Sequence, residues 1–227
     1  MMKIVFLNVW GEDMRDALVP YLAEPARDTD IFCFQEATDE MRARCASVLT
    51  GYDEFSDYKY LSTDFSFPQS IFVKKSIEIV SSGTLFSHDQ TVGHATYVEV
   101  VSDLKRLYVC NVHGHPAPFD KLDSPERIRF STEVIEFFKD KDAVVIGGDF
   151  NLEPATESVS LFRTAGYTDL IDEHDIKTTR NHFAWDLYPG HELYYSDYVF
   201  VNDKVHVENF EVVDNEVSDH LPLILSI

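Results

Sequence analysis

Short blocks of apolar residues recur along this chain, and their spacing predicts which blocks are strands and which are helices. Several blocks are continuous or alternating runs rich in β-branched and aromatic residues, with polar residues at both ends, which is the pattern of buried strands. We expect strands at Lys3–Leu7, Asp30–Phe34, Ser70–Val73, Ile77–Leu85, Thr96–Val101, Arg106–Val112, Ala143–Gly147, Tyr194–Val201, Val205–Val213 and Leu221–Ile227.

Other blocks carry apolar residues three or four positions apart, which is the spacing of one face of a helix. Ser124 followed by Pro125 is a typical helix start, because serine caps the first turn and proline fits its first position. We expect helices at Asp13–Ala23, from Thr38 through Leu49, from Ser124 through Phe138 and at Thr156–Ala165.

The order of these elements predicts the fold class. Helices alternate with buried strands at both ends of the chain, and the strands between residues 58 and 111 follow one another closely enough to pair antiparallel. This pattern predicts an α/β protein with two packed sheets and helices outside them. The 227 residues contain neither a linker rich in proline, glycine or serine nor an internal repeat, so we expect a single domain over residues 1–227.

Polar side chains follow four of the predicted strands directly. Asn8 and Glu36 follow the first two strands, Asp149 follows the run that ends at Gly147, and Asp219 with His220 precedes the last strand. A buried carboxylate is costly unless it is paired or holds a metal. Polar groups at strand ends that converge on one place therefore indicate a divalent-metal hydrolase site.

Six short motifs that contain these residues resemble the endonuclease/exonuclease/phosphatase superfamily, and they occur in the order found there. The resemblance spans residues 8 to 222 and implies a DNase I-like four-layer α/β sandwich that hydrolyses phosphoester bonds with Mg²⁺ or Mn²⁺. The motifs are Leu7-Asn8-Val9-Trp10, Gln35-Glu36, Asn111-Val112-His113, Gly148-Asp149-Phe150-Asn151, Ser196-Asp197-Tyr198 and Ser218-Asp219-His220.

The resemblance implies a metal site. Glu36 matches the principal metal ligand, Asn8 an amide that binds the metal or orients its ligands, and Asp219 a further acid nearby. Carboxylate oxygens suit a hard cation such as Mg²⁺, which keeps several water ligands. The alternative for Glu36 is that it caps the helix that follows it.

The resemblance also implies catalytic roles. Asp149 matches a residue that orients or deprotonates the attacking water, and Asn151 one that donates to a phosphate oxygen; Gly147 and Gly148 would let the backbone approach a ligand. Asp197 and His220 match a dyad at the scissile phosphate. We interpret Asp149 as the base and His220 as the charge stabiliser. His113 matches a histidine that contacts the phosphate or protonates the leaving group, a role less expected of His115.

The chain departs from members of the family at three positions, one of which is His113, where apurinic-site endonucleases have tyrosine. Trp10 stands where apurinic-site endonucleases carry an acid, and Tyr195 stands where many members have arginine. Arg180 is the favoured replacement cation for substrate binding, with Lys121, Arg127 and Arg129 as further candidates or surface charges. The segment Lys177–His191 carries Phe183, Trp185 and Tyr188, which form a pocket wall or simply pack.

The charge balance narrows the choice of partners. A formal net charge of −21 disfavours long duplex DNA, because duplex binding depends on Lys and Arg at the phosphates. The cysteines Cys33, Cys45 and Cys110 lack metal-binding spacing and are expected to be buried thiols. Ile4–Leu7 is too short for the apolar core of a signal sequence and no run approaches the length of a membrane span, so a cytoplasmic protein is expected.

Three functions remain open from the sequence. The first is a phosphoesterase, of the phosphodiesterase or phosphatase type, acting on a small phosphorylated substrate. The second is an endo- or exonuclease on single-stranded or short nucleic acid, which aromatic residues beside a basic groove would favour; the sequence shows aromatics but no basic stripe. The third is a catalytically silent phosphate-binding module, which the presence of every expected catalytic side chain argues against.

Overall fold

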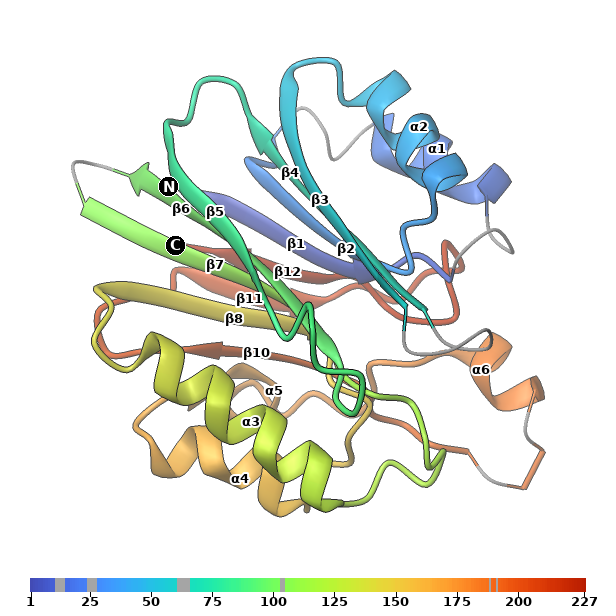
Figure 1. Cartoon of the computed structure of the whole chain (residues 1–227). Coiled ribbons are helices and arrows are strands. Elements are labelled where there is room, and N and C mark those ends of the chain that lie inside the picture. The colour runs from blue at the N-terminus through green and yellow to red at the C-terminus, as the bar shows by residue number, and fades with distance from the viewer. Residues whose placement is uncertain (11–14, 24–27, 61–65, 103–104, 188, 191) are drawn as a thin grey trace.

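A computed structural model describes most of the chain. The described residues are 1–10, 15–23, 28–60, 66–102, 105–187, 189–190 and 192–227. Within them the strands form two six-stranded mixed sheets that pack face to face, with helices on both outer faces (Figure 1). The predicted four-layer α/β sandwich is thereby confirmed.

The first sheet has the strand order β11-β12-β1-β2-β4-β3. In it β1 runs parallel to β2 and antiparallel to β12, so that both sequence ends of the fold meet at the sheet centre. Its strands are β1 (Lys3–Asn8), β2 (Ile31–Gln35), β3 (Tyr52–Tyr60), β4 (Ser66–Lys74), β11 (Asn209–Val212) and β12 (Leu223–Ser226).

The second sheet has the strand order β5-β6-β7-β8-β10-β9. Here β7 and β8 are parallel, and β10 pairs antiparallel with β8. Its strands are β5 (Ile79–Leu85), β6 (His94–Ser102), β7 (Lys105–His113), β8 (Ala143–Asp149), β9 (Thr168–Asp169) and β10 (Asp197–Val201).

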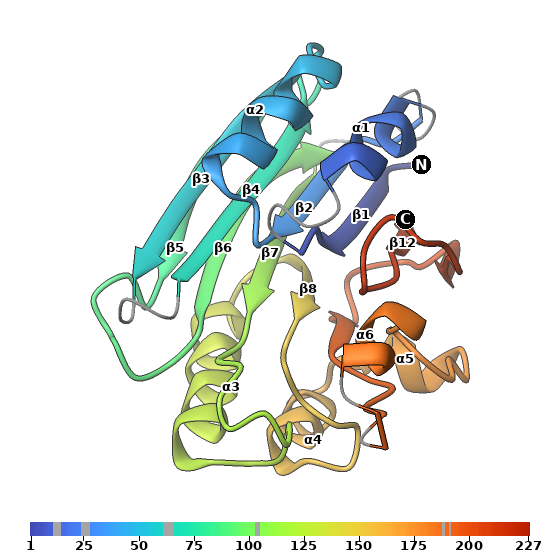
Figure 2. The same ribbon diagram turned by 90° about the vertical axis from the view of Figure 1, so that its right-hand side faces the viewer.

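Helices cover the two outer faces, as Figures 1 and 2 show. Thr38 and Ser124 cap their helices as expected, since each side chain accepts a hydrogen bond from a backbone N–H three residues on. α1 (Arg15–Ala23) and α2 (Asp39–Val48) lie over the first sheet, α3 (Pro125–Phe138), α4 (Glu157–Thr164) and α5 (Leu170–Glu173) over the second, and α6 (His182–Leu187) at one end.

The alternation along β1 shows how the layers are held together. Ile4 and Phe6 belong to the apolar cluster between the two sheets, whereas Val5 and Leu7 belong to the cluster under α1 and α2. A Cβ atom at Gly147 would lie 2.8 Å from the Phe6 ring, so this glycine permits the sheets to approach each other. The sequence interpretation, that Gly147 and Gly148 admit a ligand, is corrected: their neighbours are protein atoms.

Several boundaries differ from those predicted. The edge strand β3 was not expected, because its polar, half-exposed residues show no clear apolar alternation. The strand predicted at Val205–Val213 shortens to β11, and Lys177–His191 contains α6. Asp13, Met14 and Tyr188, on which part of the helix and wall predictions rested, lie outside the described residues. All three cysteines are buried free thiols, as expected. Among the described helices none is long and apolar enough to span a membrane.

A buried polar network joins the two sheets beside the strand ends. Asn111 on β7 accepts a hydrogen bond from Gln35 on β2 and donates to the Phe34 carbonyl at 2.9 Å, and Gln69 on β4 donates to the Asn111 carbonyl at 3.2 Å. These amide hydrogen bonds hold the two sheets in a fixed relative position at the strand ends that carry Glu36 and His113.

Replacing Asn111 by alanine is expected to destabilise the protein by about 2 kcal/mol, because it leaves the buried Gln35 amide and Phe34 carbonyl without their partner. Equilibrium urea unfolding measures the change. Asn209→Ala, at an exposed position of β11, is the control and is expected to stay within about 0.5 kcal/mol of wild type. Equal stability of the two variants would show that the network contributes nothing.

Candidate active site

The topology brings the polar strand ends to one edge of the sandwich. Asn8 ends β1 and Glu36 follows the parallel strand β2; His113 and Asp149 end the parallel strands β7 and β8 and are register partners. The antiparallel strand β10 begins at Asp197 opposite Asp149. Asp219 and His220 precede β12, which runs antiparallel to β1. All the sequence-predicted site residues therefore lie at one end of both sheets.

A cleft with a volume of about 860 Å³, within the size range of small-molecule sites, is lined by Glu36, His113, Asp149, Asp219 and His220. Asn8 and Asp197 do not line it but form hydrogen bonds with these residues. We call its polar lining residues the floor and its apolar lining residues, which come from other segments, the walls. The floor includes Glu36, His113, Lys121, Asp149, Asn151, Arg180, Asp219 and His220.

Asp149 lies at the centre of the floor and is saturated with hydrogen bonds. Its Oδ1 accepts from the Asn151 backbone N–H at 2.9 Å and the Ser196 hydroxyl at 2.5 Å, and its Oδ2 accepts from the side-chain amides of Asn8 at 3.0 Å and Asn151 at 3.3 Å. Burial favours a higher pKa for Asp149, but attraction to the His220 and His113 rings, which are protonated in acid, attraction to Lys121 and the Ser196 hydrogen bond outweigh it and hold the pKa below its ordinary value. Asp149 is therefore ionised at neutral pH.

His220 and Asp197 form the expected dyad. His220 Nδ1 lies 2.9 Å from both carboxylate oxygens of Asp197. When Asp197 is ionised, Nδ1 carries the proton and Nε2 is the free nitrogen. Nε2 lies 3.8 Å from Asp149 Oδ2 and from Asp219 Oδ1. Burial lowers the pKa of His220 to about 4, and burial together with the charge of Asp149 raises the pKa of Asp197. His220 is therefore uncharged at neutral pH and able to accept a proton.

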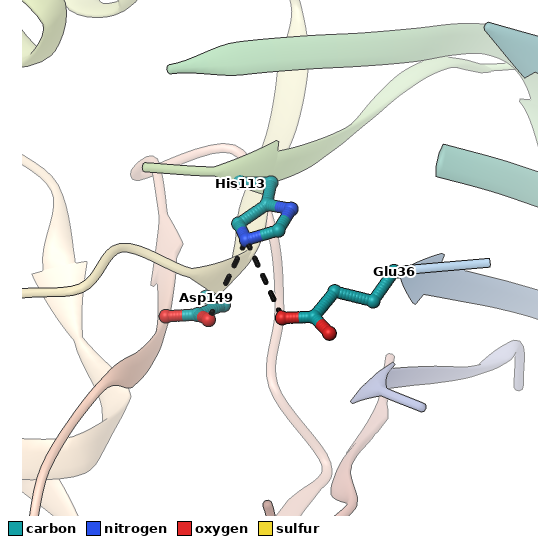
Figure 3. A group of neighbouring side chains, drawn as sticks. All are labelled: Glu36, His113 and Asp149. Atoms are coloured by element: carbon teal, nitrogen blue, oxygen red, sulfur yellow. Dashed lines mark ion pairs between the residues drawn. The ribbon is translucent and has the colours of Figure 1, made fainter. Parts of the chain in front are cut away.

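Glu36 and His113 form a second group around Asp149. His113 Nε2 lies 3.9 Å from Glu36 Oε1 and 3.8 Å from Asp149 Oδ2, as Figure 3 shows. Each distance exceeds that of a direct hydrogen bond. Burial lowers the pKa of His113 to about 4, and its Nδ1 is buried with no hydrogen-bond partner in the described part of the chain.

The donor atoms at this point fit a divalent cation. The ligand atoms of Glu36, His113 and Asp149 all lie within 4.8 Å of one another. Burial and the negative charges of Asp219 and Asp149 raise the pKa of Glu36 to about 7, although the Asn8 hydrogen bond opposes the rise. Repulsion among carboxylates without enough compensating charge is what a bound Mg²⁺ or Mn²⁺ would relieve.

The structure separates the alternatives for Glu36 and Asn8. Thr38 caps α2, so Glu36 is not the cap. The backbone φ of Glu36 is 55°, a strained conformation that is often found at functional sites. Asn8 Oδ1 accepts from the Trp10 N–H at 2.9 Å, while Nδ2 donates to Glu36 Oε1 at 3.1 Å and to Asp149. In this structure Asn8 thus orients the two carboxylates, which is one of the two roles that the resemblance implies for it.

Arg180 is fixed in the cleft by Asp219. Its guanidinium forms an ion pair with Asp219 Oδ2, and Nε donates to the Asp219 carbonyl at 3.3 Å. Backbone pairing between Arg180 and His220 aligns the two segments. The Thr179 hydroxyl accepts from the N–H groups of Ser196 and Asp197 at 3.1 and 3.2 Å. The short segment around Arg180 therefore holds both members of the dyad in position.

Lys121 is a second cation in the cleft and is not a surface charge. Its side chain is buried, its backbone has a positive φ of 55°, and Nζ donates to the Tyr195 carbonyl at 3.2 Å. Burial and the nearby Arg180 lower the pKa of Lys121 to about 8, while Asp149 and Asp197 oppose the shift. The Tyr195 hydroxyl itself donates to the Ile176 carbonyl at 3.0 Å, so Tyr195 supplies no charge where the family has arginine.

The remaining candidates from the sequence form hydrogen bonds or ion pairs with other residues of the chain. Arg127 donates to the carbonyls of His115, Pro116, Pro118 and Leu122, and Arg129 pairs with Asp89 and Glu133. His115 Nδ1 accepts from the Ala117 N–H at 3.0 Å. The Asn151 amide nitrogen donates to the Gly114 carbonyl at 3.1 Å as well as to Asp149, so in this structure it positions Asp149.

Thr179 and Ser196 were missed from the sequence. Their hydroxyls act through Asp149 and Asp197, and a lone hydroxyl residue carries no signal of such a role. For Ser196 the sequence did offer a signal, since this residue immediately precedes the dyad aspartate.

Comparison with known proteins gives the same fold. A model of the "Endonuclease/Exonuclease/phosphatase family" matches residues 5–220, and no curated protein matches. A solved endonuclease/exonuclease/phosphatase from Bacteroides vulgatus superposes with a TM-score of 0.77 at 17% identity, covering 99% of this chain and 97% of that one.

Two further solved structures have names that bear on chemistry. A mannosyl-6-phosphatase of Bacteroides thetaiotaomicron has a TM-score of 0.74 at 18% identity, covering 100% of this chain and 99% of that one. D. rerio TDP2 complexed with a single-strand DNA product has a TM-score of 0.70 at 18% identity, covering 99% of this chain and 97% of that one. At these identities the likeness extends to the fold alone.

Proposed function

The chain belongs to the endonuclease/exonuclease/phosphatase family, and from that premise we propose that it is a divalent-metal-dependent hydrolase of phosphoester bonds acting on a small phosphorylated substrate. One observation carries the proposal. His220, Asp149 and the Glu36 carboxylate line one cleft with two cations, Lys121 and Arg180, and Asp197 holds the His220 ring through Nδ1. Acids, a neutral imidazole and cations around one space are what phosphoester hydrolysis requires.

Glu36 is the proposed principal ligand of Mg²⁺ or Mn²⁺, within the group that it forms with His113 and Asp149, and the negative charge of Asp219 would add to the attraction for the cation. The bound cation would neutralise charge on the phosphate and orient water around it. Asn8 fixes the Glu36 carboxylate by its hydrogen bond to Oε1. Asp219 has its Oδ2 on Arg180, so it also holds the guanidinium at the substrate.

His220 is the proposed acceptor of the proton of the attacking water. Asp149 already accepts four hydrogen bonds, which is about the capacity of a carboxylate. His220 Nε2 is unprotonated at the cleft, and Asp197 stabilises the imidazolium as it forms. The sequence-based interpretation assigns the base to Asp149 instead, and it stays the alternative; Asp149 Oδ2 lies 3.8 Å from Nε2 of both His220 and His113. His113 contacts the phosphate or the leaving oxygen.

Lys121 and Arg180 are the proposed phosphate-binding cations. Lys121→Met is expected to lower kcat/KM roughly tenfold or more, because a hydrogen bond from a charged donor is worth about 1.5–3 kcal/mol. Since the pKa of Lys121 is about 8, the cation is lost as pH rises through that value, and wild-type kcat/KM should fall there. Lys121→Arg should remove the alkaline fall. A Lys121→Met enzyme with an unchanged KM and pH profile would contradict the role.

A short single-stranded nucleic acid is the second candidate substrate, which the likeness to D. rerio TDP2 with its single-strand DNA product favours. The net charge of −21 and the absence of a basic stripe in the sequence favour the small substrate, as does the likeness to a mannosyl-6-phosphatase. In the described residues, the cations of the cleft lining are Lys121 and Arg180, which suffice for one phosphate.

Rates on four substrates test the proposal. They are p-nitrophenyl phosphate, bis-p-nitrophenyl phosphate, a single-stranded oligonucleotide and the matching duplex, each with Mg²⁺. We expect hydrolysis of one or both nitrophenyl esters and no cleavage of duplex. The ratio of the rates on p-nitrophenyl phosphate and bis-p-nitrophenyl phosphate assigns monoester or diester preference. Faster turnover of the oligonucleotide, with a steep loss in salt, would establish the nuclease instead.

A further inference from the structure

The walls of the cleft differ in character from its floor. Trp10, Phe67, Phe119, Ala184, Leu187 and Leu193 line it together with the catalytic groups. These residues come from the segment after β1, the start of β4, the segment after β7, and α6 with the segment that follows it. Apolar side chains from four separate parts of the chain thus face the same space as the phosphate-binding groups.

Two of these residues are unusually exposed to solvent. Phe119 is 63% and Leu187 52% exposed, and both belong to the few large apolar side chains in the described part of the chain with this much exposure. Water contact with large apolar groups is unfavourable, and such groups at a cleft mouth indicate a ligand that covers them.

The wall is built on the segment that supplies the phosphate cation. Asn181, next to Arg180, donates to the carbonyls of Ser218 at 2.7 Å and Asn215 at 2.9 Å, and its Oδ1 accepts from the Phe183 N–H at the start of α6. The Phe183 ring packs 6.5 Å from that of Trp10. Helix α6 is therefore anchored beside the dyad, and its apolar face has a fixed position relative to Arg180.

The charges around the cleft limit what the wall can bind. Glu36, Asp120, Asp149 and Asp219 line the cleft against the two cations of its described residues. Together with a bound Mg²⁺, the two cations only balance these four carboxylates, so the cleft has no surplus positive charge for a substrate with several phosphates. A single phosphate on an uncharged apolar group suits this balance and the apolar lining.

We propose that the cleft selects phosphoesters whose organic group is apolar, such as an aryl group, with the phosphate at Lys121 and Arg180 and the apolar group against Phe119, Leu187 and Trp10. The inference rests on the proposed phosphoester hydrolysis and names its substrate class. Nucleoside polyphosphates are disfavoured by the carboxylates of the same cleft.

Binding of two phosphonates tests the inference without requiring turnover. Phenylphosphonate and methylphosphonate carry the same acid group on a C–P bond that is not hydrolysed, and calorimetry with Mg²⁺ gives both affinities. Phenylphosphonate is expected to bind wild type roughly tenfold more tightly, because its ring is removed from water. Phe119→Ser and Leu187→Ser should each reduce this ratio about threefold or more and leave methylphosphonate binding unchanged.

Leu122→Ser is the matched control. Leu122 is 54% exposed and lies near Phe119 in sequence, but it is absent from the cleft lining, so its replacement should leave the ratio unchanged. Equal affinity of the two phosphonates, or a preference that both wall variants retain, overturns the inference. If nitrophenyl esters are nevertheless hydrolysed, the proposed function stands. If neither phosphonate binds and no ester is hydrolysed, both proposals fail.

Discussion

Glu36→Gln is expected to lower metal-dependent phosphoester hydrolysis by roughly a hundredfold or more, because even groups that merely orient a metal ligand cost roughly 10- to 100-fold when removed. Glutamine keeps the size of the side chain and the oxygen that accepts from Asn8. It removes the negative charge that lies near Asp149 and Asp219. The loss should therefore reflect the metal and not the fold.

Thermal unfolding separates these two causes. In EDTA, Glu36→Gln should unfold at the same temperature as wild type or a higher one, since a repulsive charge has been removed. Added Mg²⁺ should raise the midpoint of wild type and leave that of the variant unchanged, because a ligand that binds the folded state alone stabilises it. Equal Mg²⁺ shifts in the two proteins would place the metal elsewhere.

His220→Ala is expected to reduce kcat by roughly 10²- to 10⁴-fold, the usual contribution of a general base or acid, with a smaller change in KM. The reason is that Nε2 faces the cleft unprotonated while Asp197 holds Nδ1. A parallel rise in KM with kcat unchanged would make His220 a binding residue.

Asp197→Asn gives a second measurement on the same dyad. The amide can present its NH₂ group to Nδ1, which favours the tautomer with the proton on Nε2 and removes the acceptor. We expect a loss of kcat comparable to that of His220→Ala, and the double variant should be little worse than either. Losses that simply multiply would show that the two residues act independently.

Much of the site could be predicted from the sequence because chemistry and position coincide there. Asn8, Glu36, Asp149 and His220 each follow or precede a buried strand, and the apolar periodicity identifies those strands without any partner being known. Once two sheets pack with their strand ends together, convergence of these side chains follows. The resemblance to a known family added their expected roles.

The roles that depend on which atom donates and which accepts a hydrogen bond could not be predicted from the sequence. Whether Asn8 presents its oxygen or its nitrogen is decided by the Trp10 N–H, and whether Asp149 is free to act as a base is decided by donors on Ser196 and Asn151. Lys121 resembles any surface lysine in the sequence. Its burial depends on a positive backbone φ and on a hydrogen bond to the Tyr195 carbonyl, which lies 74 residues further along the chain.

The most direct test of the central claim is the rate of p-nitrophenyl phosphate and bis-p-nitrophenyl phosphate hydrolysis by wild-type protein stripped of metal with EDTA and then titrated with Mg²⁺ or Mn²⁺. The proposed function predicts no turnover in EDTA and saturable recovery as the metal is added. Hydrolysis that persists unchanged in EDTA, or a protein that stays inactive on both esters and on short nucleic acid at saturating metal, would contradict it.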